Sequence, residues 1–443
     1  MDSELASWRS TGNYVDAVPP PMANVVDGMW LFKVKRPPGS LPVFKAHYMA
    51  RVFSQLEGVG FFQTFAPTPK MTTLRVLLHI AAQRDYELHS LDFSTVFLQG
   101  CLDEEIWLRR PPGFTDTFPP GTNWSLRRQV YGLRQSPCEW HDTLRSMLRD
   151  LGFLYVDDLV FATADRAALA EVKSELQKRH TCTDLGELQR YLGLQITRDR
   201  AARTITLTQS HMVHGPYAEL VGCLMYLMTC IRPNLAFPLS VLSRFVATGR
   251  HRLVHWTAAV RVAKYLATTS GMGLVLGGTQ PVVLTGHCDS SYADDVETHR
   301  STQGYCFSLG AGAVSWRSTR SSFVASSSAE AKIYAGAMAA QELRWLTFLL
   351  IDVGERLRSA PTLYADNKAM ILLCREPRRE SRVKHIDVRY FLLRELQRRG
   401  QARLDFVASE ANIADVFTKA LAPGDHHRFC VQLGLVELGP RLL

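Results

Sequence analysis

The pair Asp157-Asp158 constrains this chain more than any other feature of its sequence. Apolar residues precede the pair at 154–156 and follow it at 159–161, which predicts a β-hairpin with both acids at its tip. Two adjacent carboxylates repel each other and lose hydration unless a divalent cation offsets their charge. The pair therefore indicates a metal site, and a solvated turn with an incidental acid pair is the alternative.

A third acid and a turn segment accompany the predicted metal site. Asp92 lies where a short strand-like run beginning at Leu88 passes into a predicted helix, which places its carboxylate at a strand end. Between Asp92 and the acid pair comes the segment 130–137, Val-Tyr-Gly-Leu-Arg-Gln-Ser-Pro, followed by a helical run through Leu148. The three segments have to be interpreted together, because each is short.

Together these segments resemble the reverse transcriptase of copia-type LTR retrotransposons. That family has an Asp in a D-x-x-x-x-F-L-x-G segment, a Y-G-L-x-Q-x-P turn and a Y-V-D-D hairpin, and all three are present here in the same order. The resemblance extends from about Met29 to about Leu421. It implies an α/β (α+β) fold in which right-hand polymerase fingers and palm are followed by an RNase H-like mixed-sheet domain.

The second half of the chain carries an independent set of four acids. They are placed on a first strand, a helix, a later strand and a final helix, and they are Asp289, Glu330, Asp366 and Asp415. The segments Ser328-Ala329-Glu330-Ala331 and Tyr364-Ala365-Asp366-Asn367 resemble those of the copia-type RNase H. An Asp at a helix start is usually only a cap, so the prediction depends on all four acids lying on the expected elements.

The resemblance implies two Mg²⁺ per active site, held by Asp92, Asp157 and Asp158 in the polymerase and by the four later acids in the ribonuclease. Five further residues are expected to bind substrate: Lys45 at the triphosphate, Phe97 against the nucleotide 2′-hydroxyl, Gln135 at the nucleotide or template, and Lys384 and His385 at phosphate. Three of them have a structural alternative of comparable weight: surface charge for Lys45, core for Phe97 and turn for Gln135. His385 is expected to be structural or phosphate-facing and not catalytic. The implied partners are an RNA template, a DNA primer, deoxynucleoside triphosphates and an RNA-DNA hybrid.

Composition is consistent with an anionic partner. The 443 residues carry a net charge of +9 and have a pI near 9.1. Between Arg375 and Arg403 there are ten Lys or Arg against four acids, which predicts a basic helix, with a solvated helix face as the alternative. Nine single cysteines with no ligand spacing, and no hydrophobic leader or spanning segment, predict an intracellular protein away from membranes.

The pattern along the chain predicts five regions. They are a lead-in segment at 1–26, reverse transcriptase fingers and palm at 27–214, a thumb or connection at 215–280, the RNase H-like domain at 281–421 and a tail at 422–443. A glycine-rich linker is expected at 271–278, and the alternating run 204–208 is expected to be an edge strand.

Two joins depart from the family pattern. Leu154 follows the helix ending near Phe153 without an intervening palm strand, and Gly215 follows His214 without the segment that links palm and thumb. Lys332 stands where the family has Glu, and Asn234 where it has Asp. Loss of a sheet strand costs much of a stability of roughly 5 to 15 kcal/mol, so we expect weak or absent polymerase activity. The alternatives are a nucleic-acid-binding relic and a chain active only as an RNase H-type hydrolase.

Overall fold

The computed structural model describes residues 2–10, 12–35, 43–51, 70–93, 102, 105–111, 119, 121–133, 136, 140, 142, 144–146, 148, 160–192, 194–208, 217–246, 251–355, 357–375 and 387–438. The chain forms two compact units, each assembled from several parts of the sequence. Unit 1 contains residues 1–69, 89–161 and 165–186, and unit 2 contains residues 70–88, 162–164 and 187–443. The division does not follow the boundary expected near residue 214.

Unit 1 contains a small sheet with an aromatic core. Its strands are, in order, β1 (Tyr14–Ala17), β7 (Asn123–Leu126), β6 (Trp107–Leu108) and β2 (Val25–Val26). The helix α1 (Asp2–Ser10) and the antiparallel strands β3 (Gly28–Lys35) and β4 (Val43–Ala50) contribute to the same hydrophobic cluster.

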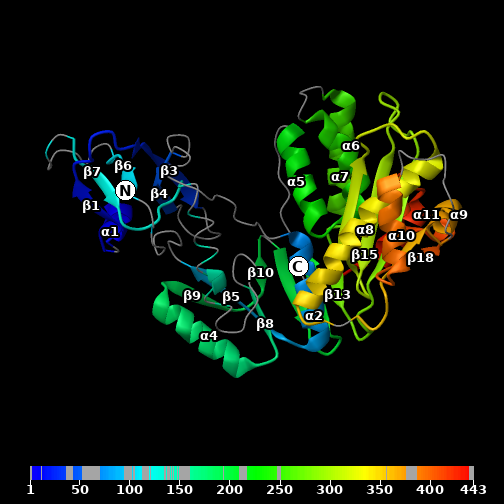
Figure 1. The fold of residues 1–443 in the computed structure, drawn as a ribbon, viewed down its shortest axis with the longest axis horizontal. Coiled ribbons are helices and arrows are strands. Elements are labelled where there is room, and N and C mark those ends of the chain that lie inside the picture. The colour runs from blue at the N-terminus through cyan, green and yellow to red at the C-terminus, as the bar shows by residue number, and fades with distance from the viewer. Residues whose placement is uncertain are drawn as a thin grey trace. The chain divides into compact units, whose positions relative to one another are not determined.

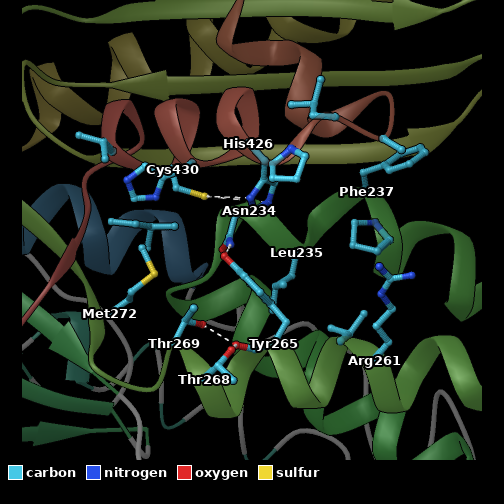
Figure 2. Close-up of a pocket in the computed structure, with 18 of the residues that line it drawn as sticks. Asn234, Leu235, Phe237, Arg261, Tyr265, Thr268, Thr269, Met272, His426 and Cys430 are labelled. Atoms are coloured by element: carbon cyan, nitrogen blue, oxygen red, sulfur yellow. Dashed lines mark hydrogen bonds between the residues drawn. The ribbon is translucent and has the colours of Figure 1, made fainter.

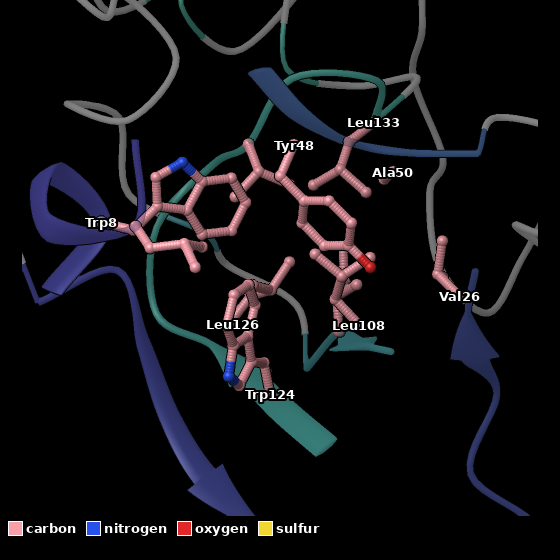
Figure 3. Close-up of a cluster of buried hydrophobic side chains, with 11 residues drawn as sticks. Trp8, Val26, Tyr48, Ala50, Leu108, Trp124, Leu126 and Leu133 are labelled. Carbon is pink, nitrogen blue, oxygen red and sulfur yellow. The ribbon is translucent and has the colours of Figure 1, made fainter. Parts of the chain in front are cut away.

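Trp8 of α1 is at the centre of this cluster. Its ring is fully buried, and the ring centroids of Trp124 and Tyr48 lie 5.4 and 6.1 Å away (Figure 3). The Tyr48 hydroxyl donates a 2.7 Å hydrogen bond to the carbonyl of Arg109, and burial raises the pKa of Tyr48. Residues 1–26 are therefore not the loose lead-in that we expected, because removal of these large rings from water stabilises α1 and β1.

The structure explains why the family-like turn has glycine at its centre, in the segment Tyr131-Gly132-Leu133. Gly132 has a φ of +91°, and a Cβ at this position would lie 2.1 Å from the carbonyl oxygen of Ala50. The amide of Ala50 donates to the carbonyl of Tyr131 at 2.8 Å, which fixes the turn against β4. Only glycine accommodates both the positive φ and this close approach.

A second sheet, most of whose residues belong to unit 1, carries Asp92. Its strands are, in order, β8 (Val160–Thr163), β5 (Glu87–Phe93) and β9 (Cys182–Glu187). The helix α4 (Arg166–Arg179) covers it through Leu169, Val172 and Leu176, which share a buried cluster with Leu91 and Phe161. Asp165 caps α4 by accepting hydrogen bonds from the amides of residues 167 and 168.

Unit 2 begins with an antiparallel five-stranded sheet. Its strands are, in order, β10 (Arg190–Tyr191), β11 (Leu194–Asp199), β12 (Thr204–Thr208), β13 (Met272–Gly277) and β19 (Leu435–Glu437). Three expectations were wrong. β12 is interior and not an edge strand, the glycine-rich run 271–278 forms β13 and not a linker, and the tail supplies β19 as well as α11 (Pro423–Gln432).

The helix α2 (Met71–Arg84) belongs to unit 2, although its sequence precedes β5. It contacts β12, β13 and β16 (Ala313–Arg320). The buried guanidinium of Arg75 donates to the carbonyls of Val314 and Thr229, both at 2.7 Å, and lies 3.8 Å from the ring centroid of Trp316. Arg75 therefore joins the early part of the chain to a strand more than two hundred residues later.

Three helices follow in the region expected to be thumb or connection. They are α5 (Tyr217–Cys230), α6 (Ala236–Leu242) and α7 (Leu253–Thr268), with the short 3-10 helices η3 (Pro233–Leu235) and η4 (Ser243–Phe245) on either side of α6. Within the described ranges, no helix is both long and apolar enough to cross a membrane.

The C-terminal part of unit 2 is a mixed five-stranded sheet. Its order is β16, β15 (Thr302–Ser308), β14 (Thr285–Ser291), β17 (Thr362–Ala365) and β18 (Arg403–Phe406). The first three strands are antiparallel, whereas β17 runs parallel to both β14 and β18. The long helix α8 (Ser328–Asp352) contacts β14 and β15, and α9 (Lys368–Arg375), α10 (Asp387–Arg398) and η6 (Ile413–Phe417) complete this part of the unit (Figure 1).

We predict that His79 makes the stability of unit 2 dependent on pH. Its Nδ1 accepts a 3.1 Å hydrogen bond from the amide of Gly277, and burial lowers the pKa of His79 to about 4. As the pH falls from about 6.5 to about 4, the unfolded chain gains a proton that the folded chain excludes, so the free energy of unfolding falls by roughly 3 kcal/mol. Urea unfolding monitored by circular dichroism across this pH range measures the loss.

The variant His79→Asn keeps an acceptor for the Gly277 amide and removes the titrating ring. Its stability should therefore change less between pH 6.5 and 4 than that of the parent. His427→Asn, at an exposed position of α11, is the matched control and should leave the slope unchanged. Equal slopes for the parent and His79→Asn would contradict the assignment.

Candidate functional site

Four predicted acids lie on the mixed sheet of unit 2 and on the elements that contact it. Asp289 is within β14. Glu330 is in the first turn of α8, Asp366 follows β17 directly, and Asp415 is within η6. Parallel pairing of Cys288 with Ala365 places Asp289, in β14, next to Asp366, just after the end of β17.

Lys332 contacts two of these acids. Its Nζ lies 3.2 Å from Oδ1 of Asp289 and 2.5 Å from Oδ1 of Asp366. The side chains of Asp289 and Asp366 are only 3% and 4% exposed, so both carboxylates are almost removed from water. A buried carboxylate needs a cation or several donors, and here one ammonium serves both.

Hydroxyl groups donate hydrogen bonds to the other carboxylate oxygen of each of these two acids. Thr418, which is fully buried, donates to Oδ2 of Asp289 at 2.5 Å. Ser409 donates to Oδ2 of Asp366 at 2.8 Å. Each oxygen of both carboxylates therefore has a donor from the protein itself.

The other two acids have separate partners. Oε2 of Glu330 accepts from the amide and the hydroxyl of Ser326, at 2.6 and 2.5 Å. Oδ2 of Asp415 lies 2.8 Å from Nζ of Lys419, whereas its Oδ1 is buried and accepts no hydrogen bond. Among the carboxylate oxygens of Asp289, Asp366 and Asp415, only Oδ1 of Asp415 has no donor.

The electrostatics of the cluster follow from burial and from these ammonium groups. Burial alone would raise the pKa of Asp289, but Lys332, Thr418 and Lys419 hold it below its usual value. Burial and the nearby charge of Asp289 raise the pKa of Asp415 to about 6, against the opposing effect of Lys419. Burial would lower the pKa of Lys332, yet its two acids raise it, so its ammonium is charged at neutral pH.

These side chains do not match a site for two divalent metal ions. Among the residues that the structure describes, no three His, Cys, Asp or Glu side chains come together in an arrangement that could hold a metal ion. The space between Asp289 and Asp366 is taken by Lys332 Nζ, and Glu330 points to Ser326. From the sequence, Lys332 is visible only as a departure from the family, and the signal it offers is a cation where the family has an acid.

The polymerase acids are only partly described. Asp92 is exposed on β5, and the neighbouring strand β8 begins just after the acid pair in the sequence. Asp157 and Asp158 lie outside the described residues, as do Phe97, Gln135, Lys384 and His385. Lys45 is on β4, but its side chain is outside the description. The roles of all eight residues, Asp92 included, stay predictions.

A large cavity lies elsewhere in unit 2, between α6, α7 and α11 (Figure 2). It measures about 1060 Å³ and is lined mainly by apolar side chains. At its edge Asn234, the second departure from the family, donates from Nδ2 to the Tyr265 hydroxyl at 2.9 Å. The buried Arg232 donates to the hydroxyl of Thr269 at 2.7 Å. The Arg232-Pro233-Asn234 segment is thus structural, since it ties η3 to the end of α7.

Comparison with known proteins identifies the family. Residues 15–154 match the family model described as reverse transcriptase (RNA-dependent DNA polymerase). The chain is 29% identical to the retrovirus-related Pol polyprotein from transposon TNT 1-94 of Nicotiana tabacum over 98% of its length, and 30% identical to that from transposon RE2 of Arabidopsis thaliana over 99%. The chain belongs to the retrotransposon Pol polyproteins.

The chain spans about a third of these relatives, 37% and 34% of their lengths. The alignment with the tobacco protein runs over 498 positions, more than the 443 residues of the chain, so that relative has stretches without a counterpart here.

Solved structures support the predicted fold. The foamy viral protease-reverse transcriptase in complex with double-stranded DNA has a TM-score of 0.53 at 13% identity, covering 90% of this chain and 67% of the other. The expected architecture, a polymerase followed by an RNase H-like domain, is therefore confirmed. The mixed sheet with α8 lies in the region expected to be the RNase H-like domain.

We predict that Thr418 stabilises the acid cluster through its hydroxyl. Thr418→Val should lower the free energy of unfolding by about 1 to 3 kcal/mol, because Oδ2 of the buried Asp289 loses its donor. Thr418→Ser keeps the donor and removes only a buried methyl group, so its free energy of unfolding should fall by less. Urea unfolding of both variants measures the difference, and equal losses would exclude the hydroxyl as the cause.

Proposed function

We propose that the chain is the RNA-directed DNA polymerase region of a copia-type Pol polyprotein, with Asp92, Asp157 and Asp158 as its catalytic acids. The supporting observation is that β5, which carries Asp92, pairs with β8, the strand that follows the acid pair. A carboxylate near the end of one strand and an acid pair just before the neighbouring strand can converge at one edge of a sheet. The match to the reverse transcriptase family supports the same assignment.

The chemistry of these acids is the binding of Mg²⁺. Bound there, two ions would lower the pKa of the primer 3′-hydroxyl and stabilise the triphosphate leaving group. The substrates are then an RNA template, a DNA primer and deoxynucleoside triphosphates. Lys45, Phe97 and Gln135 keep their proposed roles at the triphosphate, at the sugar and at the nucleotide or template.

We further propose that this activity is weak, because segments are missing at the two joins. The longer alignment with the tobacco relative supports such gaps. A missing palm strand leaves unpaired backbone groups and uncovered apolar surface beside the metal-binding acids. Both joins lie outside the described residues.

Primer extension on poly(rA)/oligo(dT) with Mg²⁺ tests the proposal. We expect little extension by the chain, and a clear gain when the matching stretches of the tobacco relative are inserted after Phe153 and after His214. Asp157→Asn in the extended chain should abolish that gain. Robust extension by the chain without insertions, lost in Asp157→Asn, would contradict the proposed impairment but support the acids.

The ribonuclease activity implied by the resemblance has less support. Hydrolysis of the RNA strand of a hybrid would need divalent ions among Asp289, Glu330, Asp366 and Asp415, and Lys332 occupies part of this space. We therefore expect hybrid cleavage no faster than that of Glu330→Gln, measured on an end-labelled RNA-DNA hybrid with Mg²⁺. Cleavage well above this variant would restore the ribonuclease prediction.

Binding of nucleic acid without catalysis is the second candidate, since the net charge of +9 favours an anionic partner. Hybrid binding should weaken steeply as salt rises and should be as tight in Asp289→Asn as in the parent. Fluorescence anisotropy with a labelled hybrid measures both.

A further inference from the structure

We propose that Lys332 is the resident cation of the RNase H-like centre, where its ammonium stands in place of a divalent metal ion. The cluster then acts as a metal-independent ionic junction that holds α8 against β14 and β17. The inference concerns unit 2 alone and does not depend on the polymerase activity proposed above.

The first support is the position of the ammonium. β14 and β17 are parallel neighbours, and their register places Asp289 beside Asp366. Nζ of Lys332 lies within 3.2 Å of one oxygen from each. Two carboxylates on adjacent strands need a cation to offset their repulsion, and Lys332 provides one from α8.

The second support is the lack of free ligand oxygens. Asp289 accepts from Lys332 and Thr418, and Asp366 accepts from Lys332 and Ser409. A divalent ion would have to displace these donors and would also lie next to the ammonium, which repels it. Oδ1 of Asp415 is open, but a single oxygen does not make a site for Mg²⁺.

The third support is the burial of the junction. Asp289 and Asp366 are almost completely buried, whereas the Lys332 side chain is 21% exposed. Lys332 is therefore the most solvent-accessible of the three side chains, and its removal would open the buried carboxylates to water and metal ions. Lys332 is thus the component whose loss should convert the junction into a cation site.

The test uses the full chain carrying Asp157→Asn and Asp158→Asn, so that the polymerase acids do not bind metal ions. Thermal unfolding is measured in EDTA and in Mg²⁺. We expect the same melting temperature in both for this parent. Lys332→Ala should melt lower in EDTA, because two buried carboxylates lose their cation, and Mg²⁺ should restore much of the loss by binding only the folded state.

Lys264→Ala, at an exposed position of α7, is the matched control and should behave like the parent. Mn²⁺ titration followed by electron paramagnetic resonance should show a bound ion in Lys332→Ala that is absent in the parent and lost again with Asp289→Asn. If Lys332→Ala does not fold in EDTA, recovery of folded protein on refolding with Mg²⁺ is the readout.

Three results would overturn the proposal. One is an Mg²⁺-dependent rise in the melting temperature of the parent that Asp289→Asn removes, since the site would then hold a metal ion with Lys332 present. Another is an unchanged melting temperature of Lys332→Ala in EDTA. The third is a loss in Lys332→Ala that neither Mg²⁺ nor Mn²⁺ reverses, which would make Lys332 an ordinary ion pair.

Discussion

The side-by-side placement of Asp289 and Asp366 is the constraint on which the C-terminal part of the molecule depends. Parallel pairing of β14 with β17 forces two carboxylates into a space with almost no water. Such an arrangement is stable only with a compensating positive charge. In this chain the charge comes from α8 through Lys332, and hydroxyls of Thr418 and Ser409 satisfy the remaining oxygens.

Much of this site could be predicted from the sequence, but not how its charge is balanced. Asp366 follows β17 as expected, and Glu330 lies in the first turn of α8, because strand and helix patterns around them are strong. The contact between Lys332 and two acids depends on the register of β14 against β17 and on the direction of a helical side chain. Local sequence patterns predict neither the strand register nor the direction of that side chain.

In the fold, too, elements that follow from local sequence could be predicted, whereas elements that depend on distant residues could not. Helices α5 and α7 agree with their apolar periodicity. The run 271–278 suggests a linker because four of its eight residues are glycines, whereas the strand character of β13 comes from pairing with β12 and β19, which are distant in sequence. Likewise, Trp8 gave no local signal that α1 belongs to the aromatic core.

The early position of α2 in the chain has a consequence for synthesis on the ribosome. Arg75 of α2 binds carbonyls near residues 229 and 314, and β13 pairs with β19 at residues 435–437. Unit 2 therefore cannot be completed until residues 435–437 have emerged. Until then α2 exposes apolar residues such as Val76 and Ile80 that are buried in the finished protein, and such a nascent chain is prone to aggregate.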